Sequence, residues 1–429
     1  MNAADYLTKE YKRSRIGYIS QCAFAYFITL MSANAFLVKL LIHLELSDAT
    51  IGIISSLGSF AVLFQLLTIA MMSRLRNTKR TVMIFNVTGH ILAAVMYLIP
   101  FLPLPLLTRQ ILVVLCFGLS ALSNNLASTL LFKWGTGFAD PHKRGDFNAI
   151  KEIVSLIGGM VLSLLMGWLM DRYEAAGNLE GVFLLFAVVM LVFNVCNFCS
   201  MMVMAEDPTN KTVRKRHNFR DVIKNTLGNR SYVNLLFASI LWQVAACMTV
   251  GFLGTYKTRE LGLSVGAIQL IGIGGNLVQM FLSRPMGRYS DRTSYVRGYS
   301  VAMIPAVIAY VVNAFTTPDR WWLIIVYTLL CGVANAGIGQ NSTMMVYSFV
   351  KDEYIVQALA MKSCIVGVIG FGASLVAGKI LSSIQEAGNV FLGIPMYGQQ
   401  LLSVITAVLA LGVVIFSSTV LQKQKPIEN

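Results

Sequence analysis

Apolar stretches of about twenty residues recur along the whole chain, and they constrain its fold more than any other feature. Each stretch is close to the length that a helix needs to cross about 30 Å of hydrocarbon. Only 13% of the 429 residues are charged, about half the fraction in an ordinary soluble domain. The sequence therefore predicts an all-α membrane protein with no segment left for a soluble catalytic domain.

Twelve membrane spans are expected. They cover about residues 16–43, 48–72, 81–103, 109–138, 147–170, 182–204, 232–256, 265–283, 298–315, 321–349, 355–381 and 398–420. The first span is too long for the apolar region of a signal peptide, and no small-residue cleavage site follows it. We expect it to be retained as a helix.

The cations between spans predict the orientation in the membrane. Twenty-four Lys and Arg fall on the side of the N-terminus and six on the other side. Loops rich in Lys and Arg stay cytoplasmic, so both termini are expected in the cytoplasm. The compact loops fit a bacterial cytoplasmic membrane. The net charge of +14 is mostly this bias and is no indication of nucleic-acid binding.

The chain divides into two similar halves around its longest polar stretch. We expect a six-helix bundle over 1–205, a basic cytoplasmic loop over 206–231 and a second six-helix bundle over 232–429. Leu46-Ser47 recurs as Leu263-Ser264 at an offset of 217 residues. Asn124 and Lys151 recur as Asn335 and Lys362 at an offset of 211. Shared offsets of this kind indicate an internal repeat.

Two loop motifs make this plan more specific. Gly287-Arg288-Tyr289-Ser290-Asp291-Arg292, with Arg297 further on, follows the eighth span, and Pro141-His142-Lys143-Arg144-Gly145 follows the fourth. Both resemble loop signatures of the major facilitator superfamily. The resemblance implies two bundles that rock around a solute site near the membrane midplane. The loop after the second span keeps the basic residues but lacks the aspartate and the glycine.

The superfamily motif implies a cytoplasmic gate. Asp291 could bind cations or exposed helix-terminal amides of the facing half, although a solvated charged turn is the plainer interpretation. A similar spacing in Gly167 to Arg172, on the opposite side of the membrane, is expected to be coincidence. The gating candidates are Gly287, Asp291, Arg292, Arg297, Arg74, Arg80, Arg144, Lys151 and Lys362.

Polar residues within spans are the candidates for solute binding. In the superfamily, helices one, four, seven and ten line the cavity, and amides with aromatic rings suit polyhydroxylated or mixed-polarity solutes. The same amides often tie membrane helices together, which is the competing interpretation. The candidates are Asn34, Gln65, Asn124, Asn125, Lys133, Trp242, Gln243, Asn276, Asn335, Gln340 and Asn341.

Ionisable residues within spans bear on coupling and cargo. Lys133 is the candidate for an anionic group of the solute, against snorkelling to the cytoplasmic headgroups. No Asp or Glu lies near the middle of any span, which weakens proton coupling. A coupling ion, proton or sodium, stays open.

The sequence favours a transporter over other classes. The four histidines are scattered, so neither a catalytic site nor a cofactor is expected, and Cys196 with Cys199 lacks the further ligands of a metal site. We expect a monomeric secondary transporter that imports a sugar or another small polar solute. Export of amphipathic compounds, transport of organic anions, a channel and a solute sensor without flux remain alternatives.

Overall fold

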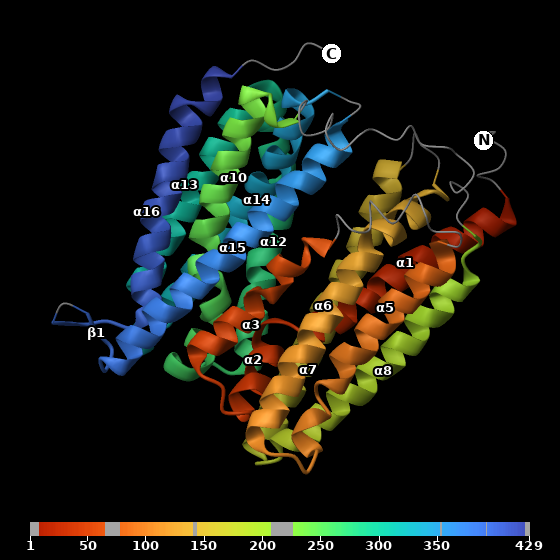
Figure 1. Cartoon of the computed structure of the whole chain (residues 1–429), viewed down its shortest axis with the longest axis vertical. Coiled ribbons are helices and arrows are strands. Elements are labelled where there is room, and N and C mark those ends of the chain that lie inside the picture. The colour runs from red at the N-terminus through yellow and green to blue at the C-terminus, as the bar shows by residue number, and fades with distance from the viewer. Residues whose placement is uncertain are drawn as a thin grey trace. The chain divides into compact units, whose positions relative to one another are not determined.

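The computed structural model describes residues 8–64, 78–139, 144–206, 226–351, 354–391 and 393–424. Helices make up nearly all of this part of the chain, and the only regular strands described are the two-residue β1 (Val390–Phe391) and β2 (Ile394–Pro395), paired antiparallel (Figure 1). The chain separates into two compact units, of which the first comprises 1–46, 64–215 and 264–269 and the second the rest. Each unit therefore contains a short segment from the other half of the sequence.

Unit 1 is a helix bundle with its own core. Its helices are α1 (Lys9–Met31), α2 (Asn34–His43), α5 (Thr78–Val95), η2 (Ile99–Phe101), α6 (Leu106–Thr136), α7 (Arg144–Ala175) and α8 (Leu179–Val203). α1 packs against α7 and α8, and α5 packs against α6 and α8. The buried rings of Tyr18, Trp134 and Phe138 lie at the centre of one hydrophobic cluster.

A buried amide network also holds unit 1 together. The Gln21 amide donates to Asn197 Oδ1 over 3.1 Å, and the Asn197 amide donates to Asn86 Oδ1 over 2.8 Å. These residues come from α1, α8 and α5, so the network joins three helices. Side-chain amides commonly link membrane helices in this way, because hydrocarbon offers them no other partner.

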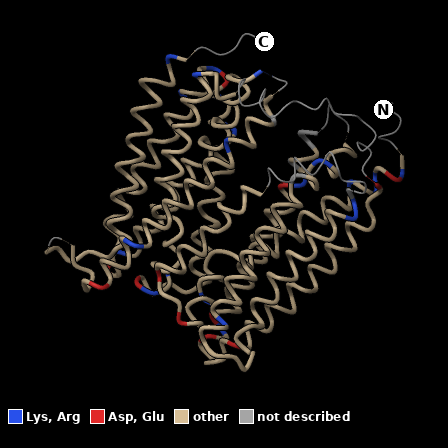
Figure 2. Tube along the Cα trace, viewed as in Figure 1, with Lys and Arg blue, Asp and Glu red and all other residues tan. Residues whose placement is uncertain are grey.

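Unit 2 contains the remaining helices. They are α3 (Asp48–Ala61), α10 (Arg230–Thr249), η5 (Val250–Phe252), α11 (Leu253–Thr255), η6 (Tyr256–Glu260), α12 (Val265–Arg292), α13 (Tyr295–Ala314), η7 (Pro318–Arg320), α14 (Leu323–Phe349), α15 (Ile355–Glu386), α16 (Gly398–Thr419) and η9 (Leu421–Lys423). The start of α12, residues 265–269, belongs to unit 1. α13 packs against α14 and α16, and α15 packs against α10 and α3. Figure 2 shows that the charged residues of both units concentrate near the helix ends.

The first helix of each half is interrupted at a repeat-related position. The expected span 16–43 is two helices, because α1 ends at Met31 and α2 begins at Asn34, whose φ is +51°. At the offset of 217 this break corresponds to residues 248–251, where α10 gives way to the 3-10 turn η5 and then to the π-helical turn η6. Interrupted helices expose backbone polar groups that regular helices conceal, and in transporters such interruptions border solute sites.

The expected all-α membrane fold is confirmed. Ten helical segments of the described residues are long and apolar enough to cross a membrane. The other two expected spans are 48–72, which begins as α3 and continues outside the described residues, and 81–103, which corresponds to α5 and η2. The boundaries at 205 and 231 remain a prediction, and most of the central loop lies outside the described residues.

Close helix contacts through glycine predict one strong packing effect. A Cβ on Gly332 of α14 would lie 2.4 Å from the Gly275 carbonyl oxygen of α12, and backbone there cannot move aside easily. We expect Gly332→Ala to lower the free energy of unfolding by about 1–3 kcal/mol through overpacking. Gly272→Ala is the control, because its Cβ would meet nothing within 4 Å. Equal melting temperatures of the two variants in detergent would refute the close contact.

Candidate functional site

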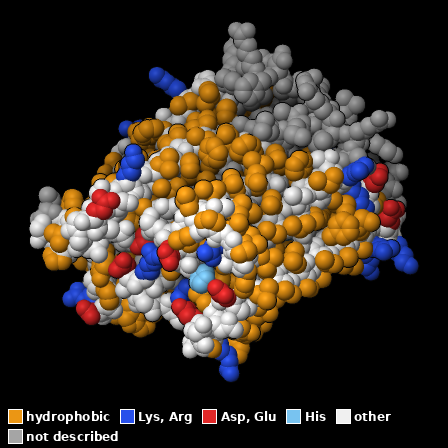
Figure 3. Space-filling model, turned by 60° about the horizontal axis from the view of Figure 1, so that its bottom comes forward, with side chains coloured by type: hydrophobic (Ala, Val, Ile, Leu, Met, Phe, Trp, Pro, Cys, Tyr) orange, Lys and Arg blue, Asp and Glu red, His pale blue; other side chains and the backbone are white. Residues whose placement is uncertain are grey.

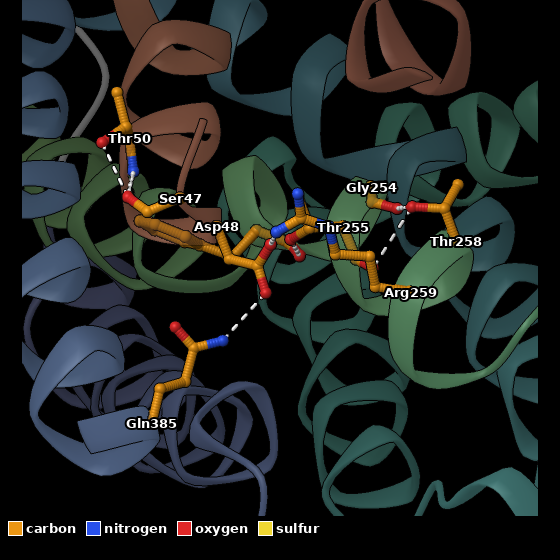
Figure 4. A network of polar contacts seen from close by, with 9 residues as sticks. Ser47, Asp48, Thr50, Gly254, Thr255, Thr258, Arg259 and Gln385 are labelled. Atoms are coloured by element: carbon orange, nitrogen blue, oxygen red, sulfur yellow. Dashed lines mark hydrogen bonds and ion pairs between the residues drawn. The ribbon is translucent and has the colours of Figure 1, made fainter. Parts of the chain in front are cut away.

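Asp48 is the centre of a buried polar network in unit 2. It lies in the first turn of α3, after the N-cap residue Ser47, and only 4% of its surface is exposed. Arg259 Nη1 donates to Oδ1 over 2.5 Å, and the Gln385 amide donates to Oδ2 over 2.8 Å (Figure 4). Both carboxylate oxygens therefore have a partner.

Three elements far apart in the sequence build this network. Asp48 begins α3, Arg259 lies in the π-helical turn η6, and Gln385 lies in the last turn of α15. Close packing sets their spacing, since a Cβ on Gly52 would lie 2.1 Å from the Phe252 ring. The π-helical turn leaves Arg259 within reach of the carboxylate, and such turns occur often at functional sites.

Asp171 makes a second contact of this kind in unit 1. It lies in the last two turns of α7 and accepts hydrogen bonds from the backbone amides of Val265 and Gly266, each over 2.8 Å. These amides are the first two of α12, where the helix dipole favours an anion. Gly167 permits the approach, because its Cβ would lie 3.1 Å from Gly266 Cα.

The internal repeat relates the two contacts. Ser47 and Ser264, which are 217 residues apart, each accept a hydrogen bond from the amide three residues later and so cap α3 and α12 in the same way. Val265 is the residue related to Asp48, and Gln385 is related at the offset of 211 to Glu174, one turn from Asp171. Each contact thus joins a helix of one sequence half to the first turn of a helix of the other.

Acidic and basic side chains mix on the face of the molecule that Figure 3 presents, beside broad hydrophobic areas. Unit 1 also contains an ion pair between α2 and α7. Lys39 of α2 lies 2.6 Å from the Glu174 carboxylate of α7. Glu174 lies one turn from Asp171, so this ion pair adds a further polar contact at the same end of α7.

The residues expected to form a cytoplasmic gate are only partly brought together. Asp291 is exposed and accepts a hydrogen bond from the Tyr295 hydroxyl over 3.2 Å, and Arg292 is exposed beside it. Gly287 faces the Gln340 amide, and the Arg297 backbone amide donates to the cap residue of α13. Arg74 and the Arg144 side chain lie outside the described residues. The gating role of this set stays a prediction.

The first half contributes a separate basic cluster at the ends of α5 and α8. The Lys79 ammonium donates to the Met204 and Met202 carbonyls over 2.6 and 3.2 Å, which places a cation at the C-terminus of α8. Burial lowers the pKa of Lys79, while Glu206 acts to raise it. Arg80 lines a groove of about 480 Å³ next to it. This cluster stabilises a helix end.

Several of the expected solute-binding residues are engaged in packing. Asn341 is 1% exposed and faces Gly298 of α13, and Asn124 faces Gly89 of α5. Trp242 packs against Tyr310 inside the core of unit 2. These contacts favour the helix-linking interpretation for all three residues.

The other candidates lie in different surroundings. Gln243 fills the space beside Gly370 on α15, and Asn125 donates to the Ala121 carbonyl of its own helix. Gln65 lies outside the described residues, and Lys133 is half-buried. The residues whose side chains are exposed are Asn34, Asn276, Asn335 and Gln340. Among the expected amides within the described residues, these four are exposed, whereas Asn124, Asn125 and Gln243 are partly buried.

Asp48, Arg259, Gln385 and Asp171 are not among the residues expected from the sequence to form a functional site. From spacing alone we expect the Gly167 to Arg172 pattern to be coincidence, yet the structure gives Asp171 the helix-terminal partners that we anticipate for Asp291. The sequence signal that could have identified Asp171 is the Gly167 to Arg172 spacing, which matches Gly287 to Arg292 on the opposite side of the membrane. Among the described residues, no group of three or more His, Cys, Asp and Glu could hold a metal ion.

Comparisons with known proteins agree with this architecture. The family model of the Major Facilitator Superfamily matches residues 21–373. An auto-inhibited POT family peptide transporter superposes with a TM-score of 0.75 at 13% identity, covering 97% of this chain and 98% of its own. A bacterial homolog of the human lysosomal transporter Spinster gives 0.68 at 16% identity and 100% of both chains. The nucleoside transporter NupG gives 0.66 at 15%, with 97% and 100% covered.

These identities are low enough that the likeness to solved structures shows the fold alone. No curated protein sequence matches the chain significantly.

Proposed function

Since the chain belongs to the Major Facilitator Superfamily, we propose that it imports a small polar solute, such as a sugar, across the cytoplasmic membrane by alternating access. The family and the solved transporters point to a secondary transporter rather than an enzyme. The observation that carries the alternating-access proposal is the pair of repeat-related contacts of Asp48 and Asp171. Each joins the two halves of the sequence through a helix end.

These contacts suit a gate because they are polar and local. Hydrogen bonds to a charged group contribute about 1.5–3 kcal/mol each, so breaking two of them is within reach of a conformational equilibrium. Large apolar interfaces between the same helices would instead lock one state. From the excess of cations in the loops on the side of the N-terminus, we expect Asp48 and Asp171 to lie at the outer end, where their contacts would close the entrance.

The exposed amides support a polar cargo. Asn34 lies at the break between α1 and α2, where its positive φ interrupts the helix within the membrane. Asn276, Asn335 and Gln340 add exposed amides on α12 and α14. Amides provide both a donor and an acceptor, which matches hydroxyl groups, and burying them against lipid without partners would be costly.

Flux measured in liposomes tests the proposed function. Purified protein is reconstituted, and uptake of radiolabelled glucose, galactose, glucuronate and a lipophilic cation is followed with and without proton and sodium gradients. Saturable uptake of a sugar or sugar acid above protein-free liposomes supports the proposal. Saturable transport of the lipophilic cation alone would make the chain an exporter, and binding without flux would make it a sensor.

A further inference from the structure

Two repeat-related lysines lie within the membrane spans but differ in their surroundings. Lys151 of α7 and Lys362 of α15 are 211 residues apart, at matching positions of the two halves. Lys151 lies 2.8 Å from the carboxylate of the next residue, Glu152. The residue after Lys362 is Ser363. The first half therefore neutralises its lysine with the next residue, whereas in the second half the next residue is uncharged.

The partners of Lys362 are neutral groups of the neighbouring helix. Its ammonium donates to the Ser342 hydroxyl over 2.5 Å and to the Ser342 carbonyl over 3.1 Å. No ion pair with a carboxylate occurs at Lys362 within the described part of the chain. A half-buried ammonium in a membrane span is costly without a counter-charge, and such groups usually pair or face a solute pathway.

The helix that Lys362 contacts presents a polar face. Asn335, Gly339, Thr343 and Tyr347 of α14 follow one another at intervals of four residues, and Ser342 is adjacent to this row. Asn335, Gly339 and Tyr347 are exposed, and Thr343 is partly so. The Thr343 hydroxyl donates to the Gly339 carbonyl of its own helix, but an exposed amide and an exposed phenol are unfavourable against hydrocarbon, which indicates that this face meets water or solute.

We propose that Lys362 binds a carboxylate of the solute, so that the cargo is a hydroxylated carboxylate such as a sugar acid. One ammonium and one carboxylate balance in charge, whereas a phosphate monoester would carry close to two negative charges. The polar face of α14 offers donors and acceptors for the hydroxyl groups. This inference rests on the proposed transport function and names its substrate class.

Matched pairs of solutes separate the carboxylate from the rest of the molecule. The full-length protein in detergent is melted with glucose or glucuronate, and with galactose or galacturonate. A ligand that binds only the folded state raises the melting temperature. We expect both uronates to raise it and both neutral sugars to leave it unchanged. The uronate shift should disappear in Lys362→Gln and return in part in Lys362→Arg.

Two further variants control for charge and folding. Lys379→Gln removes an exposed lysine of the same helix and should keep the full uronate shift. Lys362→Met replaces the ammonium with an apolar group of similar length. This variant should fold at least as well as wild type, and uronates should not raise its melting temperature.

Three results would overturn the inference. They are a uronate shift that persists in both Lys362→Gln and Lys362→Met, an equal shift with the neutral sugars, and no uronate shift in the wild type. If any of these three results is found and a neutral sugar still shows saturable uptake in liposomes, the transport function stands and only the proposed binding of a carboxylate is refuted. Loss of flux for all solutes would instead contradict the proposed function.

Discussion

Arg259→Gln is expected to lower the free energy of unfolding by about 3 kcal/mol, because it leaves the Asp48 carboxylate buried without its cation. Asp48 is 4% exposed and Arg259 34%, so the loss should be near the lower end of the usual range for breaking a buried pair. The Gln385 amide remains as a compensating donor. Thermal unfolding in detergent would show a lower melting temperature than wild type.

A double-mutant cycle distinguishes this interaction from a general effect of losing arginine. Asp48→Asn combined with Arg259→Gln removes both charges, so the double variant should be more stable than Arg259→Gln alone. Arg320→Gln, at an exposed position of η7, should change the melting temperature little. Additive effects of the two substitutions at Asp48 and Arg259 would show that the pair does not interact.

Asp171→Ala is expected to increase amide hydrogen exchange in the first turn of α12 by about 10–100-fold. The substitution removes the acceptor for the Val265 and Gly266 amides, whose hydrogen bonds to a charged group contribute about 1.5–3 kcal/mol. Exchange is followed by mass spectrometry on peptides that cover residues 261–270. Alanine favours helix, so α7 itself should stay intact.

The matched control is Asp319→Ala, which removes an exposed aspartate from η7. It should leave exchange in the first turn of α12 unchanged. Unchanged exchange in Asp171→Ala would mean that the carboxylate does not hold these amides. The assignment of Asp171 to a gate would then be wrong, whatever solute the chain moves.

The spans could be predicted because hydrocarbon imposes a length and a composition on every helix that crosses it. The helix interruptions could not. Ala33 and Val250 are ordinary apolar residues, and no proline marks either break, so the hydropathy pattern continues through both. Their conformation depends on tertiary contacts, such as the hydrogen bond from the Tyr97 hydroxyl to the Met31 carbonyl.

The candidate site was predicted less well because its contacts are distant in the sequence. Asp48 lies 211 residues from Arg259 and 337 from Gln385, and Asp171 lies 94 from Val265. Spacing within one helix cannot reveal such partners. The intramembrane amides posed the opposite problem. Residue type identified them, but the face they occupy decides between packing, as for Asn341, and exposure, as for Asn335.

The internal repeat was informative when both members of a pair were compared. Ser47 and Ser264 cap related helices, so α3 and α12 begin in the same way in the two halves. Lys151 and Lys362 instead differ in their partners. Agreement between the halves thus marks shared architecture, whereas a difference between them marks a position where one half has a separate task.

The distance between spin labels at each end of the helices tests alternating access most directly. One pair replaces the exposed Ala176 and Leu270, and the other replaces the exposed Lys12 and Thr293, in a chain whose native cysteines are replaced without loss of thermal stability. Asp171→Ala combined with Arg259→Gln should lengthen the first distance and shorten the second, since opening one end closes the other. Two distance distributions that both stay as in the parent chain would contradict alternating access through these contacts.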